Sequence, residues 1–203
     1  ARLPSTALVP RLRAAGYAPA ELDEIRACAA VFAAGNMPYV LMATLARLLL
    51  EGHAWSGAGE AGPYRARPAG GAKPPLMERH HADPATRALY DELMRTLGLP
   101  FVNTGYRALA RWPSYFAIAW ADLKQVVEGP GYAAAVQAAH EAAVHQALAL
   151  PNLAGLPPAG LVEAARQDAP LGEVLDVVRL FQWLLPGLIV NVACLQVQLD
   201  PAP

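Results

Sequence analysis

Residues 21–32, ELDEIRACAAVF, decide the fold class because their apolar side chains recur at helical spacing. Leu22, Ile25, Ala29 and Phe32 are three or four positions apart, so they would share one face of an α-helix. The same spacing recurs along most of the chain, and almost no segment alternates apolar and polar residues with the period of two that is typical of a strand. The sequence therefore predicts an all-α fold.

Glycine and proline residues divide this helical pattern into segments. We expect the first helix to end at 35–38, because Pro38 lacks the N–H that continues a helix and disfavours helical angles at the residue before it. A second helix is expected from about Tyr39 to Leu50. Further helices are expected at 84–97, 114–127, 132–150, 161–167 and 171–199, the last interrupted at Pro186-Gly187.

Residues 56–75 form the clearest boundary, because five glycines and four prolines in that stretch are typical of a linker that does not pack. Residues 23–26 and 175–179 are alike, and each precedes an apolar helix with a glycine and proline break. Duplication into two related helical repeats would explain this likeness, and so would chance. The sequence predicts a helical bundle with an N-terminal helical part at 1–55, a linker at 56–82 and a C-terminal helical repeat at 83–203.

The charge balance argues against nucleic acid as a partner. The formal net charge is −1, with 16 Lys and Arg against 17 Asp and Glu. No block of like charge could neutralise a row of phosphates. With 55% hydrophobic and 16% charged residues, the chain is apolar enough to bury a core.

Two uncharged stretches, 27–46 and 180–199, approach the length that spans a bilayer. Both contain proline, glycine and amide side chains, which are costly at bilayer depth, so buried helices are favoured and a membrane is an unexpected partner. Cys28 and Cys194 lie in apolar runs, where reduced thiols behave as small buried hydrophobes. The N-terminus lacks the pattern of a secretory signal. The expected location is therefore the cytoplasm.

The histidines do not form a recognisable metal site. His140 and His145 resemble a zinc-protease helix, but five residues turn a helix by about 500°, so the two rings lie on different faces. His80, His81 and Asp83 could chelate a metal, yet no cysteine or acidic cluster lies nearby in the sequence, and a solvated loop is favoured. No metal and no nucleotide cofactor is expected.

Two short polar turns in apolar surroundings carry the most specific chemical signal. The turns at 35–39 and 103–106 each place amide or hydroxyl groups at an expected helix start. Helix N-termini carry unpaired N–H groups and favour an anion, so both turns, if they converge, would suit a small carboxylate. Simple capping, with Asn36, Asn103 or Thr104 bonding its own helix, is the alternative.

These turns resemble the group I 2-haloacid dehalogenases, the family that acts on both D and L substrates. The resemblance rests on LRAAGY at 12–17, GNMPY at 35–39 and NTGYRALARWP at 103–113, with residues 21–26 and a looser match at 182–199. It covers most of the chain. The family's first helices, upstream of the segment matching residue 3, have no counterpart.

The resemblance implies an all-helical, homodimeric enzyme of two repeats, with a buried pocket at their interface and no cofactor. In that family an aspartate activates a water molecule, which displaces halide from the Cα of a small 2-halo carboxylic acid with inversion. The residues expected to bind the substrate are Asn36, Tyr39, Phe101, Asn103, Thr104 and Tyr106.

The catalytic aspartate of the family falls on position 105, which is Gly105 in this chain. Neither Asn103 nor Thr104, the two residues before Gly105, can replace a carboxylate as the base, so the catalytic residue is unknown. One account is a hydrolase whose base is Asp83, Asp91 or Glu92, or comes from another subunit. A second is a non-catalytic binder of a small carboxylic acid with the same fold. A third is a helical interaction protein or membrane-associated protein.

Overall fold

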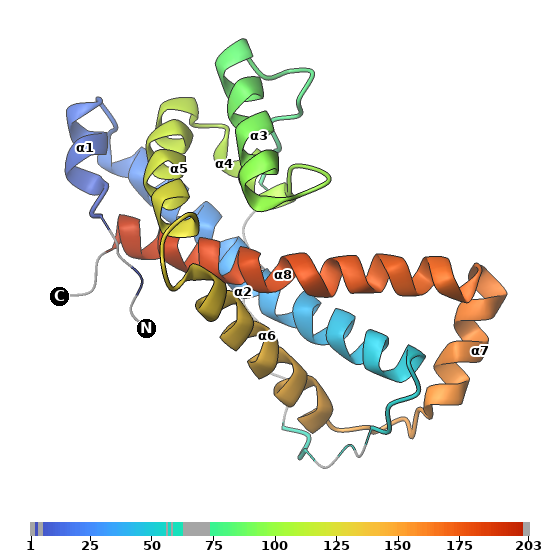
Figure 1. Ribbon diagram of the computed structural model, residues 1–203. Helices are drawn as coiled ribbons and strands as arrows, with labels where there is room; N and C mark the ends of the chain where they lie inside the picture. The colour runs from blue at the N-terminus through green and yellow to red at the C-terminus, as the bar shows by residue number, and fades with distance from the viewer. Residues whose placement is uncertain (1–2, 4–5, 56, 58, 63–73, 201–203) are drawn as a thin grey trace. The chain divides into compact units, whose positions relative to one another are not determined.

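The chain is helical throughout its regular elements in the computed structural model, which describes residues 3, 6–55, 57, 59–62 and 74–200. Within those residues no strand is formed (Figure 1). The predicted all-α fold is confirmed. Residues 56, 58 and 63–73 of the predicted linker lie outside the described residues. The helices are α1 (Val9–Ala14), α2 (Pro19–Leu50), α3 (Pro84–Leu97), α4 (Thr104–Leu109), α5 (Pro113–Val127), α6 (Tyr132–Ala149), α7 (Pro158–Asp168) and α8 (Leu171–Leu199).

Helix α2 continues through the segment at 35–38, so the prediction that this segment ends one helix and starts another is wrong. Pro38 removes one hydrogen-bond donor from the helix interior, at a cost of about 3 kcal/mol. Beyond the proline, Val40 and Leu48 are buried. Packing of this apolar face keeps the segment helical despite the proline. Helix α8 behaves in the same way, since Pro186 lies inside it and the expected interruption is absent.

The boundaries of α3 follow the residues that predicted them. Asp83 accepts hydrogen bonds from the backbone N–H groups of Ala85 and Thr86, at 2.8 and 3.0 Å. Gly98 ends the helix with a φ of 66°, in the left-handed region that glycine adopts without steric cost. Helices α5 and α6 likewise match the predicted ranges to within one residue at each end.

The chain packs into two compact units, each built from discontinuous segments. Unit 1 comprises Ala1–Ala34, Ala69–Ala135 and Val190–Pro203, and unit 2 comprises Gly35–Pro68 and Val136–Ile189. Helices α2 and α8 therefore contribute residues to both units. These boundaries differ from the division at 1–55, 56–82 and 83–203, and the interpretation as two related repeats stays a prediction.

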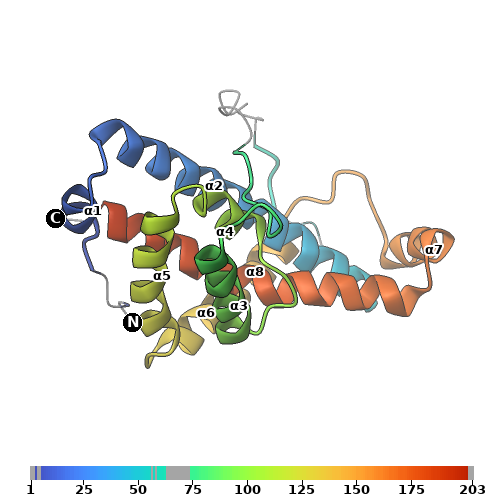
Figure 2. The ribbon, with the colours of Figure 1, turned by 90° about the horizontal axis from the view of Figure 1, so that it is seen from above.

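Unit 1 holds the second polar turn against a packed core. Helices α3 and α4 contact α5, and Figure 1 shows α3 beside α5. The N–H of Leu8, which precedes α1, donates to the carbonyl oxygen of Gln198 in α8 at 2.8 Å, and Figure 2 shows α1 beside that end of α8. The largest fully buried core side chains of this unit include Ile25, Tyr90, Leu93, Leu109, Tyr115 and Leu123.

Unit 2 contains the second half of α2, most of α6, all of α7 and the first part of α8. Glu51, just after α2, forms ion pairs with Arg47 and with Arg179 of α8, the latter at 2.9 Å. The indole Nε1 of Trp55 donates to the carbonyl oxygen of Leu150 at 2.9 Å. The ion pair therefore connects the end of α2 to α8, and the hydrogen bond connects the segment after α2 to the end of α6.

Helices α2 and α8 are long and apolar enough to cross a membrane when judged by length and composition alone. In their most apolar windows, 22% and 44% of the residues are buried. Core helices of other proteins pass the same test, so the two helices are weak evidence for a membrane location.

Candidate functional site

The turn before α4 presents a buried amide oxygen that has no hydrogen-bond donor among the described residues. Asn103 has an extended backbone and is the N-cap of α4, but its side chain makes no capping bond. Its side chain is buried, with the residue only 8% exposed, and Oδ1 accepts no hydrogen bond from the part of the chain that the structure describes. A buried carbonyl oxygen of this kind is costly unless a ligand or water donates to it. The capping alternative therefore does not account for Asn103.

The other predicted residues of this turn differ in their exposure. Phe101 is 40% exposed, Thr104 is exposed and Tyr106 is buried. A Cβ atom added to Gly105 would lie 3.4 Å from the ring of Phe32, in ordinary contact. Gly105 is part of α4 and its φ is negative, so its backbone accepts other residues. Position 105 can thus carry a side chain, which would lie beside Phe32.

A chain of three polar side chains anchors Tyr106. The hydroxyl of Tyr132 donates to Oδ1 of Asn191 at 2.9 Å, and Nδ2 of Asn191 donates to the hydroxyl oxygen of Tyr106 at 2.8 Å. Because the hydroxyl oxygen of Tyr106 accepts the hydrogen bond from Asn191, the hydroxyl hydrogen of Tyr106 stays available as a donor. Burial raises the pKa of Tyr106 well above its usual value, which keeps the phenol protonated.

Sequence reasoning did not find Phe32, Tyr132 or Asn191 as neighbours of the turn. Phe32 was expected only to share the apolar face of its helix with Leu22, Ile25 and Ala29. Asn191 carried a usable signal, because a single amide in the apolar stretch 188–195 is expected to need a buried partner.

Asn36 and Tyr39 lie inside α2, where no helix starts. The expectation that the turn at 35–39 forms a helix N-terminus for an anion is therefore wrong. Tyr39 is 60% exposed. These two residues belong to unit 2, whereas the other four predicted binding residues belong to unit 1. The convergence of the two segments on one pocket stays a prediction.

The three carboxylates considered as substitute bases are all engaged in structural contacts. Asp83 caps α3, and its Oδ2 accepts from the Thr86 hydroxyl at 2.6 Å. Asp91 accepts from both terminal nitrogens of Arg79, at 2.7 and 2.9 Å. Glu92 accepts from Lys124 at 2.6 Å and from the indole of Trp120.

These contacts weaken each of the three carboxylates as a base. The hydrogen bond from Thr86 lowers the pKa of Asp83, that from Arg79 lowers the pKa of Asp91, and that from Lys124 lowers the pKa of Glu92. A general base works best when its pKa lies near the operating pH, and the pKa values of all three carboxylates are shifted further below neutral pH.

The lowered pKa of Asp83 predicts a loss of stability in acid. Its folded pKa lies below the ordinary value of 3.8, so the stabilising contribution is present above that pH and is lost as the pH falls through the folded pKa. Asp83→Asn keeps a good capping side chain but does not titrate. We expect its urea midpoint to fall less between pH 7 and pH 3 than that of the native chain.

The control is Asp168→Asn at the exposed end of α7, which should lose stability in acid as much as the native chain does. Equal losses for the native chain and Asp83→Asn would contradict the assignment.

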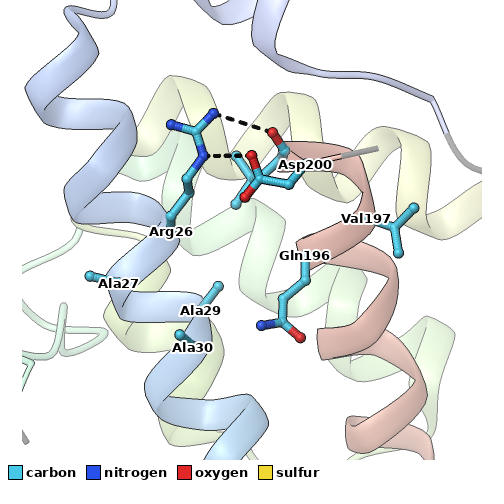
Figure 3. Close-up of a pocket in the computed structure, with 8 residues that line it drawn as sticks. Arg26, Ala27, Ala29, Ala30, Gln196, Val197 and Asp200 are labelled. Carbon is cyan, nitrogen blue, oxygen red and sulfur yellow. Dashed lines mark hydrogen bonds and ion pairs between the residues drawn. The ribbon is translucent and has the colours of Figure 1, made fainter. Parts of the chain in front are cut away.

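A surface groove of about 490 Å³ lies in unit 1, between the first half of α2 and the end of α8 (Figure 3). Arg26 in this groove donates to Asp200 at 2.9 Å, to Asp23 at 2.9 Å and to the carbonyl of Leu199 at 3.3 Å. Its guanidinium is therefore engaged. None of the predicted binding residues lines the groove.

The described residues contain no group of three or more His, Cys, Asp or Glu side chains placed to hold a metal ion. Both cysteines are free thiols. Burial raises the pKa of the Cys28 thiol to about 11, so this thiol is protonated and unreactive at neutral pH.

Two proteins of known activity are similar in sequence, although no family model matches the chain. An (R)-2-haloacid dehalogenase of Rhizobium sp. (strain NHG3) is 47% identical over 150 residues, which cover 73% of this chain and 58% of that protein. An (R)-2-haloacid dehalogenase of Pseudomonas putida is 37% identical over 191 residues, covering 90% of this chain and 62% of that protein. The chain thus spans about three fifths of the length of these relatives.

Solved structures of D-2-haloacid dehalogenase have the same fold. A mutant of such an enzyme matches with a TM-score of 0.82 at 31% identity. A complex of D-2-haloacid dehalogenase with L-LA matches with a TM-score of 0.81 at 32% identity. Each match covers 97% of this chain and 69% of the solved chain.

Proposed function

Because this chain belongs to the 2-haloacid dehalogenase family, we propose that it forms the substrate-binding part of an enzyme that acts on small 2-halo carboxylic acids. The names of the relatives support acids of the (R), or D, configuration as ligands. The resemblance noted in the sequence covers both configurations, so the choice of the (R) acid is part of the proposal.

The observation that carries this proposal is the unsatisfied amide of Asn103. Its Oδ1 is buried and accepts nothing from the described residues, and it lies two positions before the residue that matches the family's catalytic aspartate. A water molecule held by this oxygen would lie next to position 105. We propose that Asn103 holds that water, and that Thr104, Phe101 and Tyr106 contact the bound acid.

The proposed reaction is hydrolysis at Cα. A carboxylate accepts a proton from the water, the water oxygen forms a bond to Cα, and the carbon–halogen bond breaks with its electron pair on the departing halide. The products are a 2-hydroxy acid of inverted configuration, a halide ion and a proton. No cofactor takes part, because no electron or group other than halide and hydroxide is transferred.

Gly105 supports the proposal that this chain binds the acid without hydrolysing it efficiently. A glycine offers no proton acceptor, and the three carboxylates considered as substitutes, Asp83, Asp91 and Glu92, serve as a cap or as ion-pair partners. We therefore propose that the native chain binds the acid and releases halide slowly or not at all. Asn36 and Tyr39 are proposed to complete the pocket in a cytoplasmic homodimer.

Binding of the two enantiomers of 2-chloropropionate to the native chain tests the proposed function. We expect isothermal titration calorimetry to show tighter binding of the (R) acid. Asn103→Ala removes one hydrogen bond to the bound water, and should weaken binding of the (R) acid by about five- to tenfold.

The matched control is Asn152→Ala, which removes an asparagine that bonds only within its own loop, to Leu156. It should leave the affinity unchanged. Absence of binding for both enantiomers, or equal weakening by the two substitutions, would remove the proposal.

A further inference from the structure

Three buried polar atoms of unit 2 have no hydrogen-bond partner among the described residues. They are Oγ1 of Thr44, Nε of Arg47 and Nε2 of Gln182. Thr44 is 0% exposed and Gln182 is 3% exposed. A threonine hydroxyl inside a helix often bonds to the carbonyl oxygen four residues earlier, but that of Thr44 does not. Buried polar atoms without partners are rare in folded proteins, so each of the three needs an explanation, such as a bound water or ion.

The three residues lie on the sides of α2 and α8 that face each other. The ion pair between Glu51 and Arg179 joins these sides. Thr44, Arg47 and Glu51 lie within about 60° of one another around α2, and Gln182 lies about 60° from Arg179 around α8. Figure 1 shows the second half of α2 and the first part of α8 running in opposite directions. Arg47 lies about 6 Å before Glu51, and Gln182 lies about 4.5 Å after Arg179, so the two are at nearly the same level.

We call Thr44, Arg47 and Gln182 the donor cluster, because its unpaired atoms offer hydrogens. The Nε of Arg47 and the amide nitrogen of Gln182 can only donate, and the hydroxyl of Thr44 can donate or accept. A water molecule that accepted from both nitrogens would have to donate its own two hydrogens. The Thr44 oxygen is the only buried side-chain oxygen of unit 2 without a partner among the described residues. An anion accepts from all three groups at once.

The charges around the donor cluster also favour an anion. Arg47 and Arg179 share the single carboxylate of Glu51, so these three side chains carry one net positive charge. Arg179 lies 3.9 Å from Asp176 as well, but that carboxylate is 81% exposed and is screened by water and salt. A partly buried positive charge in excess is costly, and a bound anion neutralises it.

We propose that the donor cluster binds one small monovalent anion of the size of chloride or bromide. The anion accepts hydrogen bonds from Nε of Arg47, Nε2 of Gln182 and the hydroxyl of Thr44, and it holds the second half of α2 against the first part of α8. A multivalent oxyanion such as phosphate would bring more negative charge than the one net positive charge balances. This site stabilises unit 2, and it does not rest on the proposed function.

Thermal unfolding at constant ionic strength tests the proposal. Sodium gluconate, whose anion is too large for the cluster, is replaced stepwise by sodium chloride, and circular dichroism gives Tm. Gln182→Leu removes the amide donor and keeps an apolar side chain of similar size, so its Tm reports the general effect of the salts. A tenfold excess of chloride over its dissociation constant should raise the Tm of the native chain, relative to that of Gln182→Leu, by about 3 to 6 °C.

The matched control is Gln137→Leu, the same change at an exposed glutamine of α6 in unit 2 that bonds to Glu141. It should keep the full dependence on chloride. Thr44→Val keeps the shape of the side chain and removes one hydrogen bond, so it should weaken chloride binding by about five- to tenfold. In crystals of the native chain grown with bromide, the anomalous signal should place a bromide ion within hydrogen-bonding distance of Nε2 of Gln182.

Three results would overturn the proposal. The first is a native Tm that follows that of Gln182→Leu at every chloride concentration, which would assign a bridging water to the cluster. The second is a dependence on chloride that Gln182→Leu retains in full, relative to Gln137→Leu. The third is bromide that binds only elsewhere on the chain. Because no 2-halo acid is used, failure here is separate from a failure of the proposed function.

Discussion

Replacing Gly105 with Asp is expected to raise halide release from (R)-2-chloropropionate by about 10²- to 10⁴-fold over the native chain, the usual contribution of a positioned general base. The backbone at 105 accepts a side chain, and a Cβ there would lie 3.4 Å from the ring of Phe32. That apolar ring would raise the pKa of the new carboxylate by desolvation, which makes it a better base at neutral pH. Chloride release, measured over time at pH 7, gives the rate.

Gly105→Asn is the control, because it has nearly the same size and shape as aspartate but no basic oxygen. It should release no more halide than the native chain. A native chain that already releases halide as fast as Gly105→Asp would show that the base lies elsewhere. Equal gains from Asp and Asn would show that the effect of position 105 is steric.

Asn191→Ala is expected to lower the stability of the fold around the site. It removes the acceptor of the Tyr132 hydroxyl and the donor to the Tyr106 hydroxyl, and it leaves a small cavity. An unpaired buried polar group costs about 1 to 3 kcal/mol. Only the Tyr106 hydroxyl is fully buried, because Tyr132 is partly exposed, and the cavity adds to the cost, so we expect a loss of about 2 to 3 kcal/mol in the free energy of unfolding. For a chain of this size, Tm should fall by roughly 4 to 12 °C.

A second variant separates lost hydrogen bonds from lost packing. Tyr132→Phe removes one donor and leaves the rest of the network intact, so it should cost about 1 kcal/mol. Combining Tyr106→Phe, Asn191→Leu and Tyr132→Phe replaces the polar groups by apolar ones of similar shape and should recover most of the loss. If the triple variant is as unstable as Asn191→Ala, the network is not the cause. Urea denaturation at pH 7 gives all of these values.

Local signals in the sequence predicted most helix boundaries. Asp83 and Gly98 act through their own backbone neighbourhood, as a cap and as a left-handed end, so their effect does not depend on the rest of the fold. Pro38 failed as a signal because its effect competes with packing at a distance. Burial of Val40 and Leu48 offsets the lost hydrogen bond, and that burial depends on partners that the local sequence does not specify.

The sequence left two alternatives open for Asn103 and did not predict the geometry of its side chain. Asn103 was expected either to cap its helix or to bind a ligand, and the structure shows an uncapped, buried amide. Side-chain direction at a helix start depends on neighbours such as Phe32 and Asn191, which are about 70 and 90 positions away in the sequence. The exposure of Tyr39 could not be predicted from the sequence either, because it depends on which face of α2 the rest of unit 2 covers.

Unit 1 is built from segments that are far apart in the sequence, and this affects when it can fold during synthesis. This unit needs residues 1–34 and 69–135 together with 190–203, and the last of these segments leaves the ribosome after everything else in the unit. A nascent chain therefore carries α4 for several seconds before Asn191 of α8 can donate to the Tyr106 hydroxyl, at synthesis rates of about 5 to 20 residues per second. Until the last segment has been synthesised, the Tyr106 hydroxyl lacks the partner that it has in the folded unit.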